Sequence, residues 1–361
     1  MSRIATFLTR TAGNPENRAE RFGVGDLLAY GYLLFGVLVI LVPVLWTFFS
    51  SIKPERAVDS FDTRLLPMSQ VEQDAAGIGE KFAWVHTDEA GNTQIVFKAG
   101  PTRRETDVAT FEDPETVFKV PRRSLAPLEE IRVATENYLD PILKRNGEET
   151  FTFGIYLFNS VFVTVMATVI TLIINAMAAF ALSKYRFRGR LTFTILIIAT
   201  LLIPSSIILV SLFFVVWSFG IFGSLWGVII PAAATPTGVF LLRQYMLTIP
   251  DELLEAARMD AASEWRIFWR IVMPLSLPAL SVLAILSVIW RWNDFLWPLI
   301  VLISDPGKHT IQLGLTQYAG EFDSDFHYIL AMTVVSLIPI TLVFVWLQRF
   351  ITTGIATTGL K

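Results

Sequence analysis

Long apolar stretches alternate with short polar ones along most of this chain. Six apolar stretches are long enough to cross a hydrocarbon layer of ~30 Å as helices, and we expect each to be transmembrane. A proline inside such a helix frees backbone groups that neighbours must satisfy, so Pro204 predicts a kink and Pro231 and Pro236 interrupt the fourth stretch. The stretches are residues 27–49, 151–183, 191–217, 225–242, 275–303 and 326–347.

The pattern changes between the first two apolar stretches. Residues 50–150 are rich in charge and proline and contain no run that could cross a bilayer. Two β-prone runs flank a turn at residues 88–92, which predicts a hairpin. The predicted elements are strands at 81–86, 93–98 and 116–120 and an amphipathic helix at 125–138. The fold class expected is therefore an all-α integral membrane protein of six transmembrane helices with a small, mostly β external insert.

A polar, helix-forming segment separates the fourth and fifth apolar stretches. Pro250 and Asp251 predict the start of a short helix, because proline is favoured there and aspartate suits the positive end of the helix dipole. Ser263 is expected to cap a second short helix, which Pro274 ends. We expect an elbow of two helices, suited to lying in the cleft of another protein.

Lysine and arginine are distributed unevenly beside the predicted spans. One side receives the N-terminal arginines and the basic residues between spans two and three and between spans four and five, whereas Lys308 stands alone among the short loops opposite. The positive-inside rule then places both termini and the elbow in the cytoplasm and the insert outside. The predicted segments are a cytoplasmic tail (1–26), the first transmembrane helix (27–49), a periplasmic insert (50–150), a five-helix core (151–350) that includes the loop 243–274, and a flexible cytoplasmic tail (351–361).

Composition supports the membrane class and excludes several chemistries. Hydrophobic residues make up 53% of the chain and the mean hydropathy is +0.55, above the usual composition of soluble domains. The absence of cysteine excludes disulfides and thiolate metal sites. The histidines His86, His309 and His327 show no metal-binding spacing, so no metal site is expected. A net charge of −3 argues against a nucleic-acid partner.

The sequence shows no motif for binding ATP. No lysine is followed by serine or threonine, so the phosphate loop that ends Gly-Lys-Ser/Thr is missing. We therefore expect a non-catalytic chain that binds no cofactor of its own.

The residue order of the elbow resembles the EAA loop of permease subunits in binding-protein-dependent ABC importers. In that family the loop is a coupling helix that docks on a cytoplasmic ATPase subunit. The family usually has glycine after the aspartate, where this chain has Ala261, and alanine resists a left-handed turn by about 1–2 kcal/mol. We therefore expect a differently built elbow. The resemblance assigns coupling to Glu255, Ala256, Ala257, Asp260, Ala261, Ser263 and Pro274.

Shorter motifs resemble the carbohydrate-uptake, maltose-type branch of that family. They are Lys53-Pro54-Glu55, Glu136-Asn137-Tyr138, Asn159-Ser160 and the Gly-rich C-terminus. A long insert after the first span resembles the α-glucoside transporter permeases. The resemblance implies location in a bacterial inner membrane, contact with lipid and sugar, a second homologous permease, two subunits that bind ATP and Mg, and an external sugar-binding protein. The insert contacts that protein or has a structural role only, and both readings stay open.

A polar cluster interrupts the middle of the fifth apolar stretch. Charge at that depth costs ~2.5–3.5 kcal/mol per residue and usually faces a bundle interior or a watery cavity. Arg291 and Asp294 are three residues apart and could neutralise each other on one helix face. The candidates for the sugar pathway are Trp292, Asn293, Asp294 and Phe295, which also resemble the family motif at this position. The alternative is that the cluster holds the helices together.

The predicted function is that of a permease subunit in an ATP-driven importer of α-glucosides or other oligosaccharides. One alternative is an ion-coupled secondary sugar transporter, which often carries two matching halves, although no internal repeat is visible here. Another is a membrane scaffold whose external insert is the working part, which would leave the elbow without a purpose.

Overall fold

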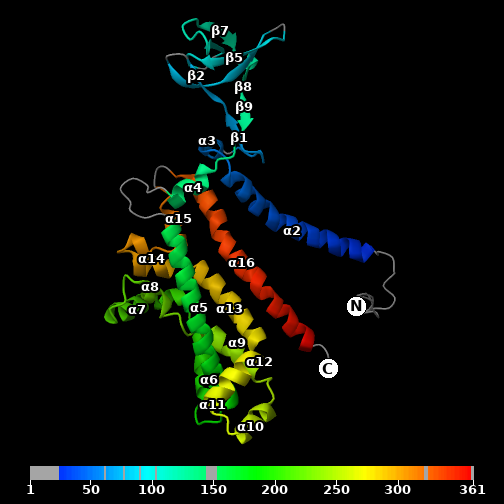
Figure 1. The fold of residues 1–361 in the computed structure, drawn as a ribbon, viewed down its shortest axis with the longest axis vertical. Helices are drawn as coiled ribbons and strands as arrows, with labels where there is room; N and C mark the ends of the chain where they lie inside the picture. Colours follow the sequence, from blue (N-terminus) through cyan, green and yellow to red (C-terminus); the bar gives the residue numbers. More distant parts are fainter. Residues whose placement is uncertain are drawn as a thin grey trace. The chain divides into compact units, whose positions relative to one another are not determined.

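The computed structural model describes residues 24–60, 62–75, 78–88, 91–101, 104–143, 153–320 and 324–358 (Figure 1). The chain divides into two units, Met1–Phe49 and Ser50–Lys361. Within the described residues, the first unit is helix α2 (Val24–Ser51), which extends just past the boundary. Its apolar side chains are exposed around the helix, as expected of a span that faces lipid. Most of the predicted tail 1–26 lies outside the described residues.

The insert is mainly antiparallel β-structure, as predicted. Its main sheet has five strands in the order β7-β6-β5-β4-β8, and two pairs, β1 with β9 and β2 with β3, complete it. The elements are α3 (Glu55–Asp59), β1 (Met68–Gln70), β2 (Glu72–Ala75), β3 (Gly79–Phe82), β4 (Trp84–Thr87), β5 (Thr93–Lys98), β6 (Glu105–Thr110), β7 (Phe118–Pro121), the 3₁₀ turn η2 (Arg122–Ser124), β8 (Leu125–Pro127), β9 (Glu129–Ile131) and α4 (Glu136–Leu143).

The predicted hairpin is confirmed, because β4 pairs with β5 from Trp84↔Val96 to Thr87↔Thr93. The predicted amphipathic helix at 125–138 is wrong. That stretch forms β8 and β9, and helix begins only at Glu136. The edge of β4 takes up β8, and an edge strand accommodates Pro127, which has no N–H to donate. Long-range pairing therefore overrode the local apolar spacing.

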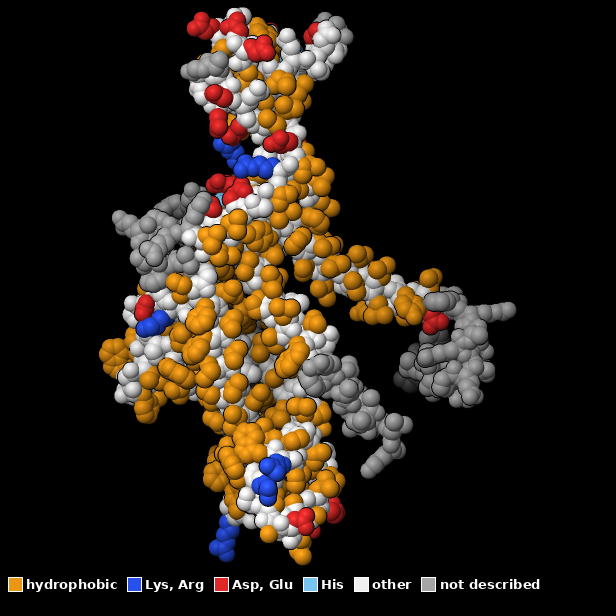
Figure 2. Space-filling view, in the orientation of Figure 1, with side chains coloured by type: hydrophobic (Ala, Val, Ile, Leu, Met, Phe, Trp, Pro, Cys, Tyr) orange, Lys and Arg blue, Asp and Glu red, His pale blue; other side chains and the backbone are white. Residues whose placement is uncertain are grey.

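The rest of the second unit is helical. Helix α5 packs against α9 and α13, and α13 packs against α16 (Figure 1). Hydrophobic side chains cover most of the visible helical surface (Figure 2). The elements are α5 (Phe153–Lys184), α6 (Arg190–Thr200), α7 (Ser205–Ser218), α8 (Leu225–Ile229), α9 (Pro236–Met246), α10 (Asp251–Met259), α11 (Glu264–Ile267), the π-helix η3 (Phe268–Val272), α12 (Met273–Leu275), α13 (Leu277–Trp292), α14 (Leu296–Leu302), the 3₁₀ turn η4 (Pro306–Lys308), α15 (Ile311–Thr316) and α16 (Phe326–Thr358).

Three helices of the described chain are long and apolar enough to cross a membrane. They are Gly25–Ser51, Phe153–Lys184 and Phe326–Gln348, and a pair bent by 77°, Glu264–Leu275 with Leu277–Trp292, would make a fourth. The first, second and sixth predicted spans are thus confirmed as continuous helices. Six crossings stay a prediction.

The other three predicted spans are not single helices, and in the third and fourth a proline starts a new helix instead of kinking one. The third breaks between Thr200 and Ser205, where Pro204 has extended backbone angles and caps α7. The fourth is α8 and α9, with Pro236 in the first turn of α9, where its missing N–H costs nothing. The fifth breaks after Trp292.

The C-terminal boundary also differs from the prediction. Helix α16 continues to Thr358, so residues 351–358 are helical and the expectation of a flexible tail from 351 is wrong there. Residues 359–361 lie outside the described residues.

Candidate functional site

The elbow between α9 and α13 consists of two short helices, as its sequence predicts. Helix α10 begins directly after Pro250, with Asp251 and Glu252 in its first turn. Ser263 caps α11, because its hydroxyl accepts the backbone N–H of Arg266 at 3.3 Å. The helical segment continues through η3 and α12 and ends at Leu275, one residue after the predicted end at Pro274.

Ala261 makes the turn of the elbow. Its φ is 57°, and among the described residues it is the single non-glycine residue with positive φ. The N–H of Ala262 reaches the carbonyl of Ala257, and that of Ala261 reaches Arg258, both at 3.0 Å. This double closure is a Schellman motif. The left-handed turn is therefore built in the usual way although alanine occupies the glycine position, and the expectation of a differently built elbow is wrong.

Apolar side chains on the inner face of the elbow fix it to the helical core. Leu254 is 1% exposed, and Ile267 and Phe268 are also buried. They belong to one hydrophobic cluster with Phe180 of α5 and Leu242 of α9. Complete burial of a leucine stabilises by roughly 1.5–3 kcal/mol, so the elbow and the core form one packed body.

Lysine and tyrosine at the end of α5 add polar anchors. Lys184 is almost completely buried, and its ammonium donates to the carbonyl of Ile249 at 2.5 Å and to Asp251 at 2.7 Å. The Lys184 contact holds the pKa of Asp251 below its usual value. The Tyr185 hydroxyl donates to Glu264 at 2.7 Å, and burial, together with that carboxylate, raises the pKa of Tyr185 to about 12. Neither anchor was predicted from the sequence. The one available signal was their place at the end of a span.

The outer face of the elbow is open to solvent in this chain. Ala257 is partly buried against the core cluster, and Pro274 lies beyond the elbow in α12. Met259 is 87% exposed and was missed, although it follows Glu255 by four residues and so shares its helix face. Six of the predicted coupling residues are exposed. They are Glu255, Ala256, Asp260, Ala261 and Ser263 in the elbow, and Pro274 beyond it.

The second predicted site lies at the break between α13 and α14. Trp292 is 4% exposed, and its indole N–H donates to the carbonyl of Ser336 in α16 at 3.0 Å. The Arg291 guanidinium donates to the carbonyl of Ala232, between α8 and α9. Both side chains thus connect α13 to other parts of the bundle, as the structural alternative for this cluster requires.

The next three residues of the cluster are more accessible. Asn293 is the C-cap of α13, is exposed and donates to the carbonyl of Ile289 at 2.8 Å. Asp294 is half-buried and accepts the backbone N–H of Trp297 at 3.4 Å. Phe295 is 39% exposed. Sugar contact by the four predicted residues stays a prediction, and its accessible part is Asn293, Asp294 and Phe295.

Comparison with known proteins assigns the family. Residues 172–357 match the family described as the binding-protein-dependent transport system inner membrane component. The chain belongs to this family. This inner membrane component is 33% identical over 245 residues to the arabinooligosaccharides transport system permease protein AraQ of Bacillus subtilis, across 66% of its own length and 87% of that protein.

Two further relatives and one structure complete the comparison. AraQ of Halalkalibacterium halodurans is 36% identical over 203 residues, 56% of this chain and 72% of that protein. The sn-glycerol-3-phosphate transport system permease protein UgpE of Pectobacterium atrosepticum is 32% identical over 250 residues, 69% and 87% of the two chains. A solved bacterial ABC transporter involved in the import of the acidic polysaccharide alginate has a TM-score of 0.62 at 22% identity, over 91% of this chain and 99% of that chain. At that identity the likeness shows the fold alone.

In this inner membrane component, the short motifs outside the elbow make structural contacts. The Asn137 amide donates to the carbonyls of Ser51 and Lys53 at 2.9 and 2.8 Å, and the hydroxyls of Tyr138 and Ser51 are 2.6 Å apart. Lys53 is 1% exposed and donates to the carbonyl of Asp62 at 2.6 Å. The Lys-Pro-Glu and Glu-Asn-Tyr motifs therefore hold together the two ends of the insert.

Two asparagines inside the bundle also make structural contacts. The Asn159 amide donates to the carbonyls of Gly307 and His309 at 3.0 Å. Asn175 donates to the Thr235 hydroxyl at 2.8 Å and accepts the Thr235 N–H at 3.1 Å. Asn175 thus links α5 to the start of α9, and the second contact also satisfies backbone freed by the break before α9.

Proposed function

We propose that this chain is the permease subunit of an ATP-driven importer of a sugar-based solute, and that the elbow couples it to a separate ATPase subunit. The observation that carries the proposal is the elbow itself. Its inner face is packed against the core, and its outer face presents exposed residues. The sequence itself lacks the phosphate loop of an ATPase. A rigid elbow with an open outer face suits the transfer of movement from a neighbouring subunit to the bundle.

The solute class rests on the relatives. The names of these relatives specify arabinooligosaccharides and sn-glycerol-3-phosphate. Both are polyhydroxylated, and exposed Asn293 with Phe295 offers the amide and aromatic face that such solutes use. The α-glucoside class stays a prediction, as does direct contact by these residues. Family membership argues against an ion-coupled carrier and against a scaffold.

The proposed assembly follows from the same reasoning. A second homologous permease covers part of the exposed apolar surface, and two ATP-binding subunits supply ATP and Mg. An external sugar-binding protein delivers the solute to the face that carries the insert. The chain lies in a bacterial inner membrane with both termini and the elbow in the cytoplasm.

The elbow contact is tested by charge reversal on its outer face. Glu255→Lys, on the exposed face of α10, should reduce ATPase co-purification and solute uptake at least about tenfold. Reversal at Glu115, an exposed glutamate of the insert, is the matched control and should leave co-purification unchanged. Wild-type co-purification and uptake in the Glu255→Lys variant would refute the coupling role.

Solute contact is tested separately at the α13–α14 break. Asn293→Ala should lower uptake while co-purification with the ATPase stays at the wild-type level, because Asn293 is exposed and lies at the end of α13 opposite to the elbow. Unchanged uptake would remove Asn293 from the pathway. Loss of assembly would instead favour a role in holding the helices together.

A further inference from the structure

Three side chains of types that can bind a metal ion lie close together where α3 and α16 begin. A ligand atom from each of Glu55, Asp325 and His327 lies within 4.8 Å of the other two. Glu55 follows the first span and His327 opens the last one, so no spacing rule along the sequence could bring them together. The expectation that scattered histidines exclude a metal site considered spacing alone.

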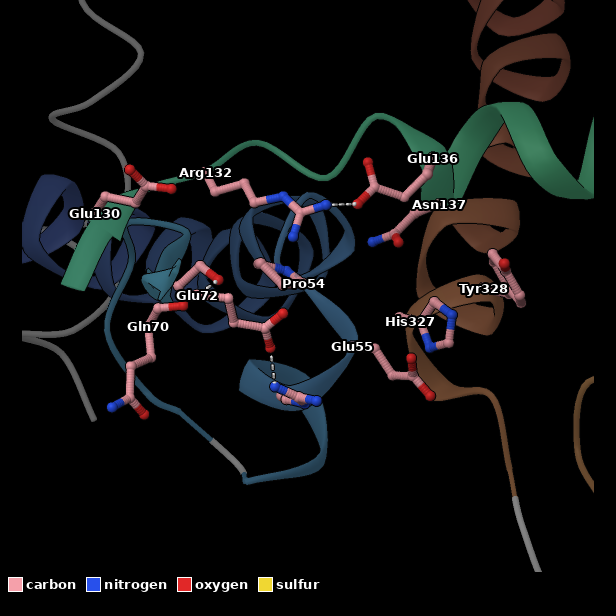
Figure 3. A pocket seen from close by; sticks show the side chains of 12 residues that line it. Pro54, Glu55, Gln70, Glu72, Glu130, Arg132, Glu136, Asn137, His327 and Tyr328 are labelled. Carbon is pink, nitrogen blue, oxygen red and sulfur yellow. Dashed lines mark hydrogen bonds and ion pairs between the residues drawn. The ribbon is translucent and has the colours of Figure 1, made fainter. Parts of the chain in front are cut away.

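His327 is the buried member of this cluster. It is 6% exposed, and its Nδ1 atom has no hydrogen-bond partner among the described residues. An unsatisfied buried polar atom costs about 1–3 kcal/mol, so a protein seldom keeps one without a use. Figure 3 shows the His327 ring beside the Glu55 carboxylate, at the edge of a cavity of about 450 Å³. A bound cation would satisfy the ring.

Neighbouring basic residues do not neutralise the carboxylate. Arg56 pairs with Glu72, and Arg132 pairs with Glu136 at 2.9 Å. Glu55 has no ion pair among the described residues, although it lies beside these four side chains in the cavity wall. The cavity therefore keeps an uncompensated carboxylate next to an unsatisfied imidazole nitrogen.

The backbones that carry the ligands are held in place. The N–H of Asp325 donates to the carbonyl of Tyr318 at 3.0 Å, and the Asp325 carbonyl accepts the N–H of Ile329 at 3.0 Å. On the other side, Asn137 holds the chain just before Glu55 through two hydrogen bonds to backbone carbonyls. The cluster thus stands on anchored segments and needs only side-chain rotation to close.

We propose that Glu55, Asp325 and His327 bind a divalent transition metal, with Zn²⁺ the best fit. Imidazole selects such ions over Ca²⁺ and Mg²⁺, which prefer oxygen ligands alone. Bonds of about 2.0–2.1 Å place tetrahedral ligand atoms about 3.4 Å apart. The ligand atoms now lie within 4.8 Å of one another, and the exposed carboxylates of Glu55 and Asp325 can move inward to the shorter spacing. Water from the cavity takes the fourth position. The ion ties the segment after the first span to the start of the last span.

The test is a Zn²⁺ titration of the purified, chelator-treated full chain, with a chromophoric chelator as competitor. Glu55→Gln and Asp325→Asn keep side-chain size but remove ligand charge, and each should weaken Zn²⁺ binding at least about tenfold, the scale known for residues that merely support metal ligands. Glu130→Gln changes an exposed carboxylate of the same cavity wall and should leave the affinity unchanged. The readout is independent of transport, so it stands apart from the proposed function.

Two results would overturn the proposal. Equal Zn²⁺ affinity in the wild type and the Glu55→Gln/Asp325→Asn double variant would mean adventitious binding only. Tighter binding of Ca²⁺ than of Zn²⁺ at the same residues would refute the metal class. Both substituted side chains are exposed, so the variants should fold, and circular dichroism of each chain checks this directly.

Discussion

The turn at Ala261 allows a test with two substitutions of opposite sign. Alanine in the left-handed region costs about 1–2 kcal/mol, and Ala261→Gly removes that cost. Glycine also loses more backbone entropy on folding, by about 0.5–1 kcal/mol. The net effect should be stabilisation of the elbow by roughly 0.5–1 kcal/mol. Ala256→Gly, in the exposed interior of α10, should instead destabilise it by about 1 kcal/mol.

Hydrogen exchange of the elbow amides measures this difference locally. Because 1.4 kcal/mol corresponds to a factor of ten, Ala261→Gly should slow exchange of the Ala261 and Ala262 amides about two- to fivefold. Ala256→Gly should accelerate exchange across α10 about fivefold. The helix α5, which neither change touches, serves as the internal reference. Faster exchange in Ala261→Gly, or equal effects of the two glycines, would refute the left-handed turn.

Three further predictions concern the anchors of the same fold. Leu254→Ala should destabilise the elbow by about 2–5 kcal/mol through an unfilled cavity, and proteolysis between α10 and α11 should accelerate; unchanged cleavage would contradict the packing. Lys184 lowers the pKa of Asp251, so their contact stabilises the elbow fully above the unfolded aspartate pKa of ~3.9. This stabilisation is lost as the pH falls through the lower pKa of the folded state. Hydrogen exchange of the elbow amides in Asp251→Asn should therefore differ from wild type at neutral pH and converge with it in acid. Asn137→Leu leaves two backbone carbonyls without donors and should lower the melting temperature of the chain, whereas an unchanged value would show that water replaces the amide.

The elbow shows how far local sequence reaches. Asp251 and Ser263 marked the starts of two helices correctly, because dipole and capping interactions act within one helical turn. Ala261 was different. Its intrinsic cost favoured another backbone, but the two hydrogen bonds of the Schellman motif and the burial of Leu254 and Phe268 on either side outweigh about 1–2 kcal/mol.

The candidate sites show where that reach ends. The motif at Trp292 was visible in the sequence. That Trp292 is buried while Asn293 and Phe295 are exposed depends on the end of α13 and on the contact of Trp292 with α16. Lys184 and Tyr185 were missed for the same reason, since their partners are far along the chain. The meeting of Glu55 with His327 has no local signal at all.

The sequence alone determined the membrane class and the insert, because the length of an apolar run decides whether a helix can cross lipid. Which three of the six runs are continuous helices depended on the structure. The sequence also determined the elbow, because caps and prolines act on neighbouring residues. Only the tertiary structure decided the break of the fifth span after Trp292, the strands at 125–131 and the contacts of Asn137. In the strands and at Asn137, backbone groups found their partners in a distant segment, and the energy of those contacts is absent from any window of the chain.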